Sequence, residues 1–402
     1  MELLLKLGAL LIAVFFGIFG FLRWRLQRRE RRERAGEERF RRVLARMKKD
    51  RAVAQTDAAQ LLRARRPEAQ SAINSHLFAL PTWIHDVPLP LEELKTKFTK
   101  SDAFPIPVTP TAGLPAAPVP YDSFSQCIQK LAPPKEFNDY PHYRLLAIES
   151  KLLQFSKTKT SYFKKIDFGQ YLEYRWFCER WPNWLRRSGC AKLWGTISTP
   201  ADYMVLAGVS TLTLLHDGAN MRFIMHQRGQ QETAFAMGTF HVAPAGEFQP
   251  ACEAPTSFEL DLDIWNNIMR EYGEELGGQD DYDGHSNELF NYHLSPYREL
   301  CRGRQAGNIR LYYFGTGLDP LTLQGEILTV AVFRERIFNR IFPNVLARNS
   351  EGKFNNSGGK WGTPFNESEC KRYLATNTLA SGQLLIKLAL LNYKVFRDCL
   401  SH

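Results

Sequence analysis

The sequence predicts a mixed α/β body preceded by one transmembrane helix and one basic helix. From residue 203 onward, strand-like runs alternate with an amphipathic helix. Residues 3–22 hold a single charge, Lys6, over a length that spans about 30 Å as a helix. The formal charge of +10 gathers in one segment, because residues 23–51 hold fourteen Lys/Arg against five Asp/Glu.

The apolar stretch at residues 3–22 is long enough to cross a bilayer as one helix. Lys6 reaches the interface from the outer end, and Trp24 stands where an interfacial aromatic residue is expected. A cleaved signal peptide is the alternative, but an arginine run follows rather than a small-residue cleavage site. The positive-inside rule then predicts a single-pass protein with the lipid bilayer as partner and its C-terminal body in the cytoplasm.

The basic segment, residues 23–66, has the charge pattern of a helix. Glu30 precedes Arg34 by four residues and Glu37 precedes Arg41 by four, which is the favourable order. We expect this helix to lie on anionic lipid headgroups, with association between copies as the alternative. The rest of the chain is close to neutral and shows no aromatic platform or recognition fold, so no nucleic-acid partner is expected. Seven cysteines without a C-x-x-C pair argue against a disulfide framework or a zinc site.

Composition divides the remainder of the chain into four segments. Residues 67–120 are expected to form a linker, because nine of the chain's 22 prolines lie between 81 and 120. Residues 121–200 are expected to be helical and rich in aromatic residues. These aromatic side chains recur at helical spacing, which is typical of core residues. The core proper is expected over 201–350, and a loop with helices over 351–402.

Within the core, two strand-like runs flank HDGAN, a hairpin turn candidate. A further strand carries His241, which we interpret as a core or turn histidine, and ends in a Pro/Gly loop. The next run is predicted to be a helix that ends at Gly277-Gly278. Its apolar face consists of Ile264, Ile268, Tyr272 and Leu276. Two more strands follow. Asn366 with Glu369 predicts a capping box ahead of a helix, and the chain finishes with an amphipathic helix.

Three carboxylates on the predicted helix are the strongest candidate for chemistry. Glu271, Glu274 and Glu275 have the spacing i, i+3 and i+4, so they share one helical face. A hard divalent cation such as Mg²⁺ offsets the repulsion between them, and metal with carboxylates suits diphosphate chemistry. Arg270 is placed to fix a carboxylate. The alternative is a solvated acidic helix face.

This region resembles the Nudix family, whose box reads G-x5-E-x7-R-E-U-x-E-E-x-G-U after a strand and a Pro-Gly-Gly-type turn. The second half of the box matches here: Arg270, Glu271, Tyr272, Glu274, Glu275 and Gly277. Gly246, in Pro-Ala-Gly, resembles the first box glycine. The first half departs, because Cys252 stands at the glutamate position and sixteen residues separate Glu253 from Arg270. The resemblance implies a Nudix-like α+β sandwich over about a third of the chain.

By the same resemblance, Glu274 and Glu275 are expected to be metal ligands, and Glu271 a ligand or base. Gly246 is expected to offer its carbonyl oxygen to Mg²⁺, and Arg270 to belong to the catalytic set. Glu326 is a candidate for a further acidic residue outside the box.

The Gly/Asn-rich loop near residue 360 offers a second set of candidates. Trp361 is a candidate for stacking on a base and Lys360 for meeting a phosphate. A loop anchored by Trp361 and Phe365 is the alternative.

The combination of a single span, a basic helix and a Nudix-like domain resembles the transmembrane-Nudix effectors of bacterial CBASS antiphage systems. That resemblance implies a protein of the bacterial inner membrane that senses a cyclic nucleotide, self-associates through its span and kills the infected cell. One alternative is a membrane-tethered, Mg²⁺-dependent hydrolase of a nucleoside diphosphate derivative. Another is an anchored scaffold with a degenerate Nudix fold.

Overall fold

The computed structural model describes residues 2–65, 76–99, 121–134, 137–157, 160–178, 199–228, 239–279, 288–343, 352–357 and 359–400, with side chains from Ile18 onward. The helices are α1 (Glu2–Arg65), α2 (Phe124–Leu131), α3 (Tyr162–Lys165), α4 (Tyr171–Cys178), α6 (Pro255–Leu260), α7 (Ile264–Glu275), α8 (Tyr297–Gln305), α9 (Glu335–Ile341), α10 (Glu367–Leu374), α11 (Ala380–Leu391) and α12 (Tyr393–Asp398). A π-helical turn, Ile166–Gln170, joins α3 to α4.

The longer strands are β1 (Ile84–Pro90), β2 (Lys95–Thr99), β4 (Leu145–Glu149), β5 (Leu152–Ser156), β7 (Ala207–His216), β9 (Met225–Arg228), β12 (Ile309–Leu318) and β13 (Gly325–Arg334). The short strands are β3 (Pro141–His142), β6 (Thr160–Ser161), β8 (Met221–Phe223), β10 (Phe240–Val242), β11 (Ala245–Glu247), β14 (Gly352–Phe354), β15 (Asn356–Ser357), β16 (Lys360–Trp361) and β17 (Thr363–Pro364).

The central sheet has the strand order β1-β12-β13-β7-β8-β17, and β11 pairs with β7 on a branch. β7 and β13 run parallel, in register from Ala207 opposite Gly325 to His216 opposite Arg334. Both strands are buried along almost their whole length, as strands covered on both faces are. This pair forms the rigid floor on which the site described below is built.

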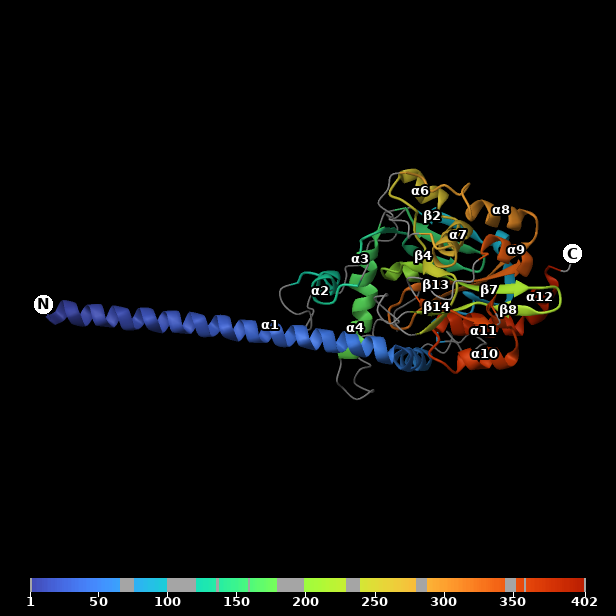
Figure 1. Ribbon diagram of the computed structural model, residues 1–402. Coiled ribbons are helices and arrows are strands. Elements are labelled where there is room, and N and C mark those ends of the chain that lie inside the picture. Colours follow the sequence, from blue (N-terminus) through green and yellow to red (C-terminus); the bar gives the residue numbers. More distant parts are fainter. Residues whose placement is uncertain are drawn as a thin grey trace.

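Helices cover both faces of this sheet (Figure 1). Alternate side chains of β13 point to opposite sides, as the pleat requires. Leu328 and Val330 join the cluster that contains Leu384 of α11, whereas Ala331 joins the cluster that contains Ile268 of α7. α7 and α11 are therefore held at fixed positions on opposite faces of one sheet.

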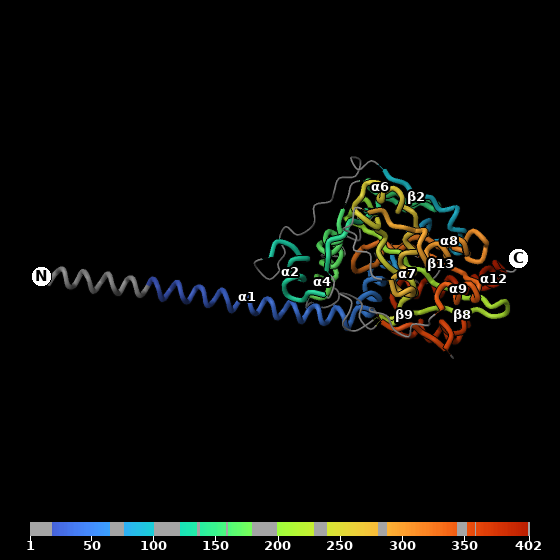
Figure 2. Tube along the Cα trace, turned by 45° about the horizontal axis from the view of Figure 1, so that its top comes forward, coloured from blue at the N-terminus to red at the C-terminus, as the bar shows by residue number. Residues whose placement is uncertain are grey.

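α1 packs along this body through one apolar stripe on its C-terminal half. Buried side chains recur every three or four residues, as expected of one helical face: Phe40, Val43, Leu44, Met47, Ala54, Ala58 and Leu62. The ring of Phe40 meets that of Tyr174 in α4, with centroids 5.2 Å apart. From Ile18 to the start of the stripe, α1 projects away from the body (Figures 1 and 2).

The expected transmembrane helix is not found, and the predicted fold class is corrected accordingly. α1 continues without a break from Glu2 to Arg65, and no helix among the described residues is long and apolar enough to cross a membrane. From Ile18 on, arginines and glutamates are interspersed with the apolar side chains of α1, and such charges are costly in lipid. The fold is a mixed α/β body with a long N-terminal helix.

The predicted single-pass location in the inner membrane loses its support for the same reason. Most of the stretch 3–22 lies outside the residues whose side chains are described. The self-association predicted through this stretch therefore stays a prediction.

Several other segments differ from the expectation. Part of the proline-rich stretch 67–120 is built into sheets, because β1 pairs with β12 and β2 pairs with β5. The segment 121–200 contains strands as well as helices.

The predicted hairpin turn at residues 216–220 is present, since Asp217 Oδ1 accepts hydrogen bonds from the backbone N–H groups of Ala219 and Asn220. The final helix is broken at Asn392 into α11 and α12.

Candidate functional site

A cavity of about 380 Å³ lies against α7 and the edge of β7 and β11. Its walls also include the end of β9, one residue of β13, the first turn of α11, and side chains between residues 138 and 170. Two residues of α1, Arg51 and Gln55, complete it. Segments from both ends of the chain therefore meet around the carboxylates that the sequence singled out.

Gly246 of β11 and Glu271 of α7 approach each other closely at this wall. β11 pairs Gly246 with Val209 of β7, which fixes the glycine in front of α7. The Glu271 carboxylate occupies the place where a Cβ on residue 246 would stand. Asn267 Nδ2 binds the carbonyl oxygen of Glu247 at 2.9 Å and so locks α7 to β11. The glycine is therefore needed for close approach of this carboxylate.

Arg270 is buried and organises the loop ahead of α7. Its Nη1 lies 3.2 Å from Asp261 Oδ1 and 2.5 Å from the Tyr292 hydroxyl, and its Nη2 donates to the Gln249 carbonyl at 2.6 Å. Asp261 also accepts the backbone N–H of Ala251. Sequence reasoning expected Arg270 to fix a carboxylate but missed Asp261, because an insertion obscures the spacing of this loop.

The three predicted metal ligands are divided by the fold. Glu271 and Glu274 line the cavity, whereas Glu275 does not. Glu275 is 5% exposed, and its Oε1 accepts the backbone N–H of Ala245 at 2.8 Å. Among the described residues, no group of three or more His, Cys, Asp or Glu side chains is arranged to hold a metal ion. Of the three glutamates that the sequence predicts as Mg²⁺ ligands, only Glu271 and Glu274 therefore lie at the cavity.

Lys165, at the end of α3, supplies a cation that sequence reasoning did not single out. Its Nζ forms an ion pair with Glu247 of β11, and His142 Nε2 lies 3.5 Å from the other oxygen of the same carboxylate. Burial alone would raise the pKa of Glu247, but Lys165 and His142 overcome it and lower that pKa to about 2. Glu247 therefore stays ionised at neutral pH.

Arg51 lies within the apolar stripe of α1 and is met there by two carboxylates. Its Nε lies 3.0 Å from Glu173 Oε1 in α4, and its Nη2 lies 3.2 Å from Asp319 Oδ2 after β12. Gln55 Nε2 also donates to Asp319 Oδ2, at 2.5 Å. Burial raises the pKa of Glu173 to about 7, although Arg51 opposes the shift. No local sequence signal could have paired these residues, because they are far apart in the chain.

Glu326, the candidate acid outside the box, lines the same cavity from β13. Its Oε2 accepts a hydrogen bond from Ser210 Oγ at 2.9 Å. Burial raises the pKa of Glu326, which favours its neutral form. His241 lines the cavity too, at 5% exposed, and its Nε2 lies 3.3 Å from the same serine oxygen.

Trp361 and Lys360 are not brought to the cavity. Trp361 is 1% exposed and lies against Phe338 and Phe354, and its indole N–H donates to the Phe342 carbonyl at 3.3 Å. A side chain so enclosed has no ring face left for a base, so the alternative of an aromatic loop anchor describes it. Lys360 is exposed at the start of β16.

Comparisons with known proteins give weak structural similarity. No protein-family model and no curated protein matches the chain. Among solved structures, the chain is similar to the crystal structure of a NUDIX hydrolase from Alicyclobacillus acidocaldarius, at 13% identity over 48% of this chain and 96% of that one, with a TM-score of 0.29. This similarity is too low to carry an argument, and it says nothing of antiphage defence or cyclic-nucleotide sensing.

Proposed function

We propose that the protein binds a nucleoside diphosphate or a related phosphorylated nucleotide in this cavity. The observation that carries the proposal is that Glu271 and Glu274 share one cavity with Lys165 and Arg228, which come from segments far outside the motif. Arginine and lysine form strong charge-assisted hydrogen bonds with phosphate oxygens. The antiphage role expected from the sequence depended on the membrane anchor, and only its nucleotide-sensing part is kept.

Unpartnered polar atoms in the cavity wall support a ligand that also donates hydrogen bonds. Among the described residues of this wall, three side-chain amide oxygens are buried without a hydrogen-bond partner: Gln170 Oε1, Gln249 Oε1 and Asn267 Oδ1. All three residues line the cavity. Buried acceptors of this kind are rarely left unmet in native proteins. Ribose hydroxyls or base amino groups are donors of the required type, so a nucleotide suits both the acceptors and the cations.

Calorimetric titration of the full chain with ADP tests this proposal. We expect saturable binding in the absence of Mg²⁺. Binding should weaken roughly tenfold in Lys165→Gln, because one charge-assisted hydrogen bond is lost. Lys360→Gln removes the same charge from an exposed position outside the cavity and should bind as wild type does. No binding of ADP or of cyclic AMP at millimolar concentration would refute the proposal.

Hydrolysis of a nucleoside diphosphate derivative is the second candidate, and it is favoured by the presence of Glu271 and Glu274 in the cavity. It predicts release of AMP from ADP-ribose in the presence of Mg²⁺, lost in Glu274→Gln. Binding of ADP-ribose without turnover at any Mg²⁺ concentration would leave the protein as a binder alone.

A further inference from the structure

The first turn of α11 opens onto the cavity, on the wall formed by Leu379, Ala380 and Ser381. Hydrogen bonds between β10 and the segment before α11 hold it there, including one from the Leu379 N–H to the Phe240 carbonyl at 2.9 Å. α11 has twelve residues, and no side chain caps its N-terminus. The first N–H groups of a helix have no partner within it and carry the positive end of its dipole. Such a terminus is suited to an anion.

His241 supplies an independent sign of a ligand at this turn. Its ring packs on Gly382, with Nδ1 3.1 Å from the point where a Cβ of residue 382 would stand. The side chain is buried, yet Nδ1 has no hydrogen-bond partner. Burial first, and then the charges of Arg228, His226 and Arg51, lower the pKa of His241 to about 3. A neutral imidazole whose Nε2 meets Ser210 Oγ and whose Nδ1 has no hydrogen-bond partner therefore faces the start of α11.

Arg228 adds a cation from the end of β9. It lines the cavity, and its Nε is buried without a hydrogen-bond partner. His241 and Tyr162 line the same cavity, and the positive charge of Arg228 acts to lower the pKa of both side chains. Ser210 Oγ lies 2.9 Å from Glu326 Oε2 and 3.2 Å from Ser381 Oγ in the first turn of α11. Burial raises the pKa of Glu326, which favours the uncharged form of this carboxyl group.

We infer that the first turn of α11, together with Arg228 and His241, binds a phosphate group. The identity of the rest of the ligand, a nucleotide, rests on the proposed function. The site itself requires only a phosphate group. The motif glutamates lie on α7, which packs on the opposite face of the sheet from α11, and none of them belongs to this proposed phosphate site. It binds through backbone N–H groups and fixed side chains.

Removing one helix N–H tests the site directly. Ala380→Pro deletes the first N–H of α11, and proline is well tolerated at this position of a helix. Leu379 already has φ −60° and ψ 150°, the conformation that a following proline requires. Ala380→Val adds similar bulk but keeps the N–H. With inorganic phosphate as the probe, titrated into the full chain by calorimetry, we expect roughly tenfold weaker binding in the proline variant and wild-type binding in the valine variant.

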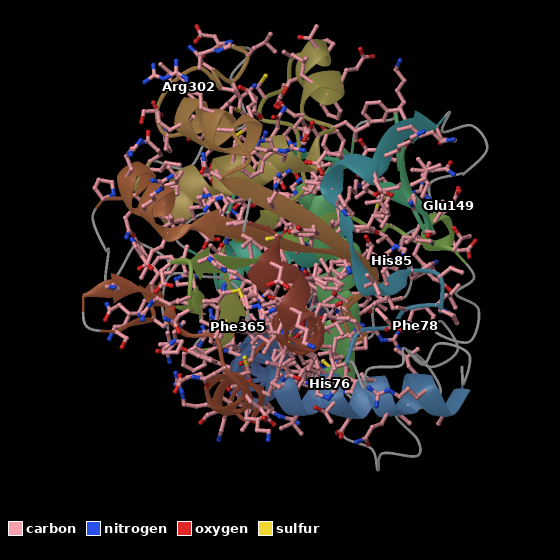
Figure 3. The ribbon with its side chains drawn as sticks, turned by 90° about the vertical axis from the view of Figure 1, so that its right-hand side faces the viewer. His76, Phe78, His85, Glu149, Arg302 and Phe365 are labelled. Atoms are coloured by element: carbon pink, nitrogen blue, oxygen red, sulfur yellow. The ribbon has the colours of Figure 1, made fainter. Side chains whose placement is uncertain are left out.

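A second pair of variants does not depend on packing around residue 380. Arg228→Gln should weaken phosphate binding to a similar extent. Arg302→Gln removes the same charge from the outer surface of α8 (Figure 3) and should leave binding unchanged. Equal phosphate binding by wild type, Ala380→Pro and Arg228→Gln would overturn the inference, as would the absence of phosphate binding to wild type. Failure of the proposed function would appear separately, as phosphate binding without any binding of ADP.

Discussion

The carboxylate of Glu271 lies directly on the α-carbon of Gly246, in the space that a side chain at residue 246 would fill. This contact joins α7 to β11 and places the best-supported part of the motif at the cavity wall. It also explains physically why a glycine precedes α7 in this chain, because any larger residue would push the carboxylate away.

Gly246→Ala should therefore displace the Glu271 carboxylate and weaken ligand binding. The added methyl group meets only the end of a flexible side chain, so the loss of stability should stay below the roughly 1–3 kcal/mol that overpacking of a rigid core costs. Calorimetric titration with ADP measures the binding, and urea denaturation measures the stability. Gly20→Ala is the matched control, because a Cβ there meets no atom within 4 Å, and it should cost nothing. Unchanged stability and binding in Gly246→Ala would show that Glu271 moves without consequence.

Arg51→Met should destabilise the protein strongly. The substitution leaves Glu173 and Asp319 buried without their cation, and breaking a buried pair from one side costs about 3–5 kcal/mol. Thermal or urea unfolding measures this loss. Arg302→Met, at an exposed position, should change stability by no more than about 0.5 kcal/mol. Equal stabilities would mean that α1 does not depend on Arg51 for its packing.

The stability of the protein should fall as pH rises from about 4.5 to 7, in part because of Glu173. Its pKa is raised by burial from 4.5 to about 7, so in this range the folded chain holds a proton that the unfolded chain has lost. The contribution is about 1 kcal/mol per pH unit within the window. Glu173→Gln is neutral at every pH and should show a flatter decline in urea denaturation at pH 5, 6 and 7.

Glu149→Gln provides the comparison for this pH series, because Glu149 is exposed at the end of β4 (Figure 3). It should retain the decline seen in wild type. A Glu173→Gln variant whose stability depends on pH as steeply as that of wild type would contradict the assignment of this decline to Glu173.

Trp361→Ala separates a core role from a ligand-stacking role. Truncating a buried tryptophan costs about 3–5 kcal/mol, so the free energy of unfolding should drop by that amount. The more conservative Trp361→Phe should keep the fold and bind ADP with wild-type affinity. Weaker ADP binding in a well-folded Trp361→Phe variant would restore the stacking role considered from the sequence.

Local features of this protein follow from the sequence because short-range chemistry decides them. The 3.6-residue period placed Ile268 and Tyr272 on the buried face of α7, and both are fully buried. Asn366 caps α10 by accepting the Glu369 N–H at 2.9 Å, as the capping-box spacing indicated. The motif likewise located Gly246, Glu271 and Glu274, which meet in one cavity.

Only the tertiary structure decided which other residues complete that cavity. Arg51, Lys165 and Arg228 lie on separate elements, and no spacing along the chain relates them to α7. The partner of Arg270, Asp261, was hidden by an irregular loop, and Glu275 was diverted to the backbone of Ala245. The length of the apolar stretch 3–22 suggested a membrane helix, whereas no helix among the described residues is long and apolar enough to span a membrane. The apolar face of a helix and its cap are determined by residues that are neighbours in the sequence. Ion pairs and cavities depend on residues far apart in the sequence that packing brings together.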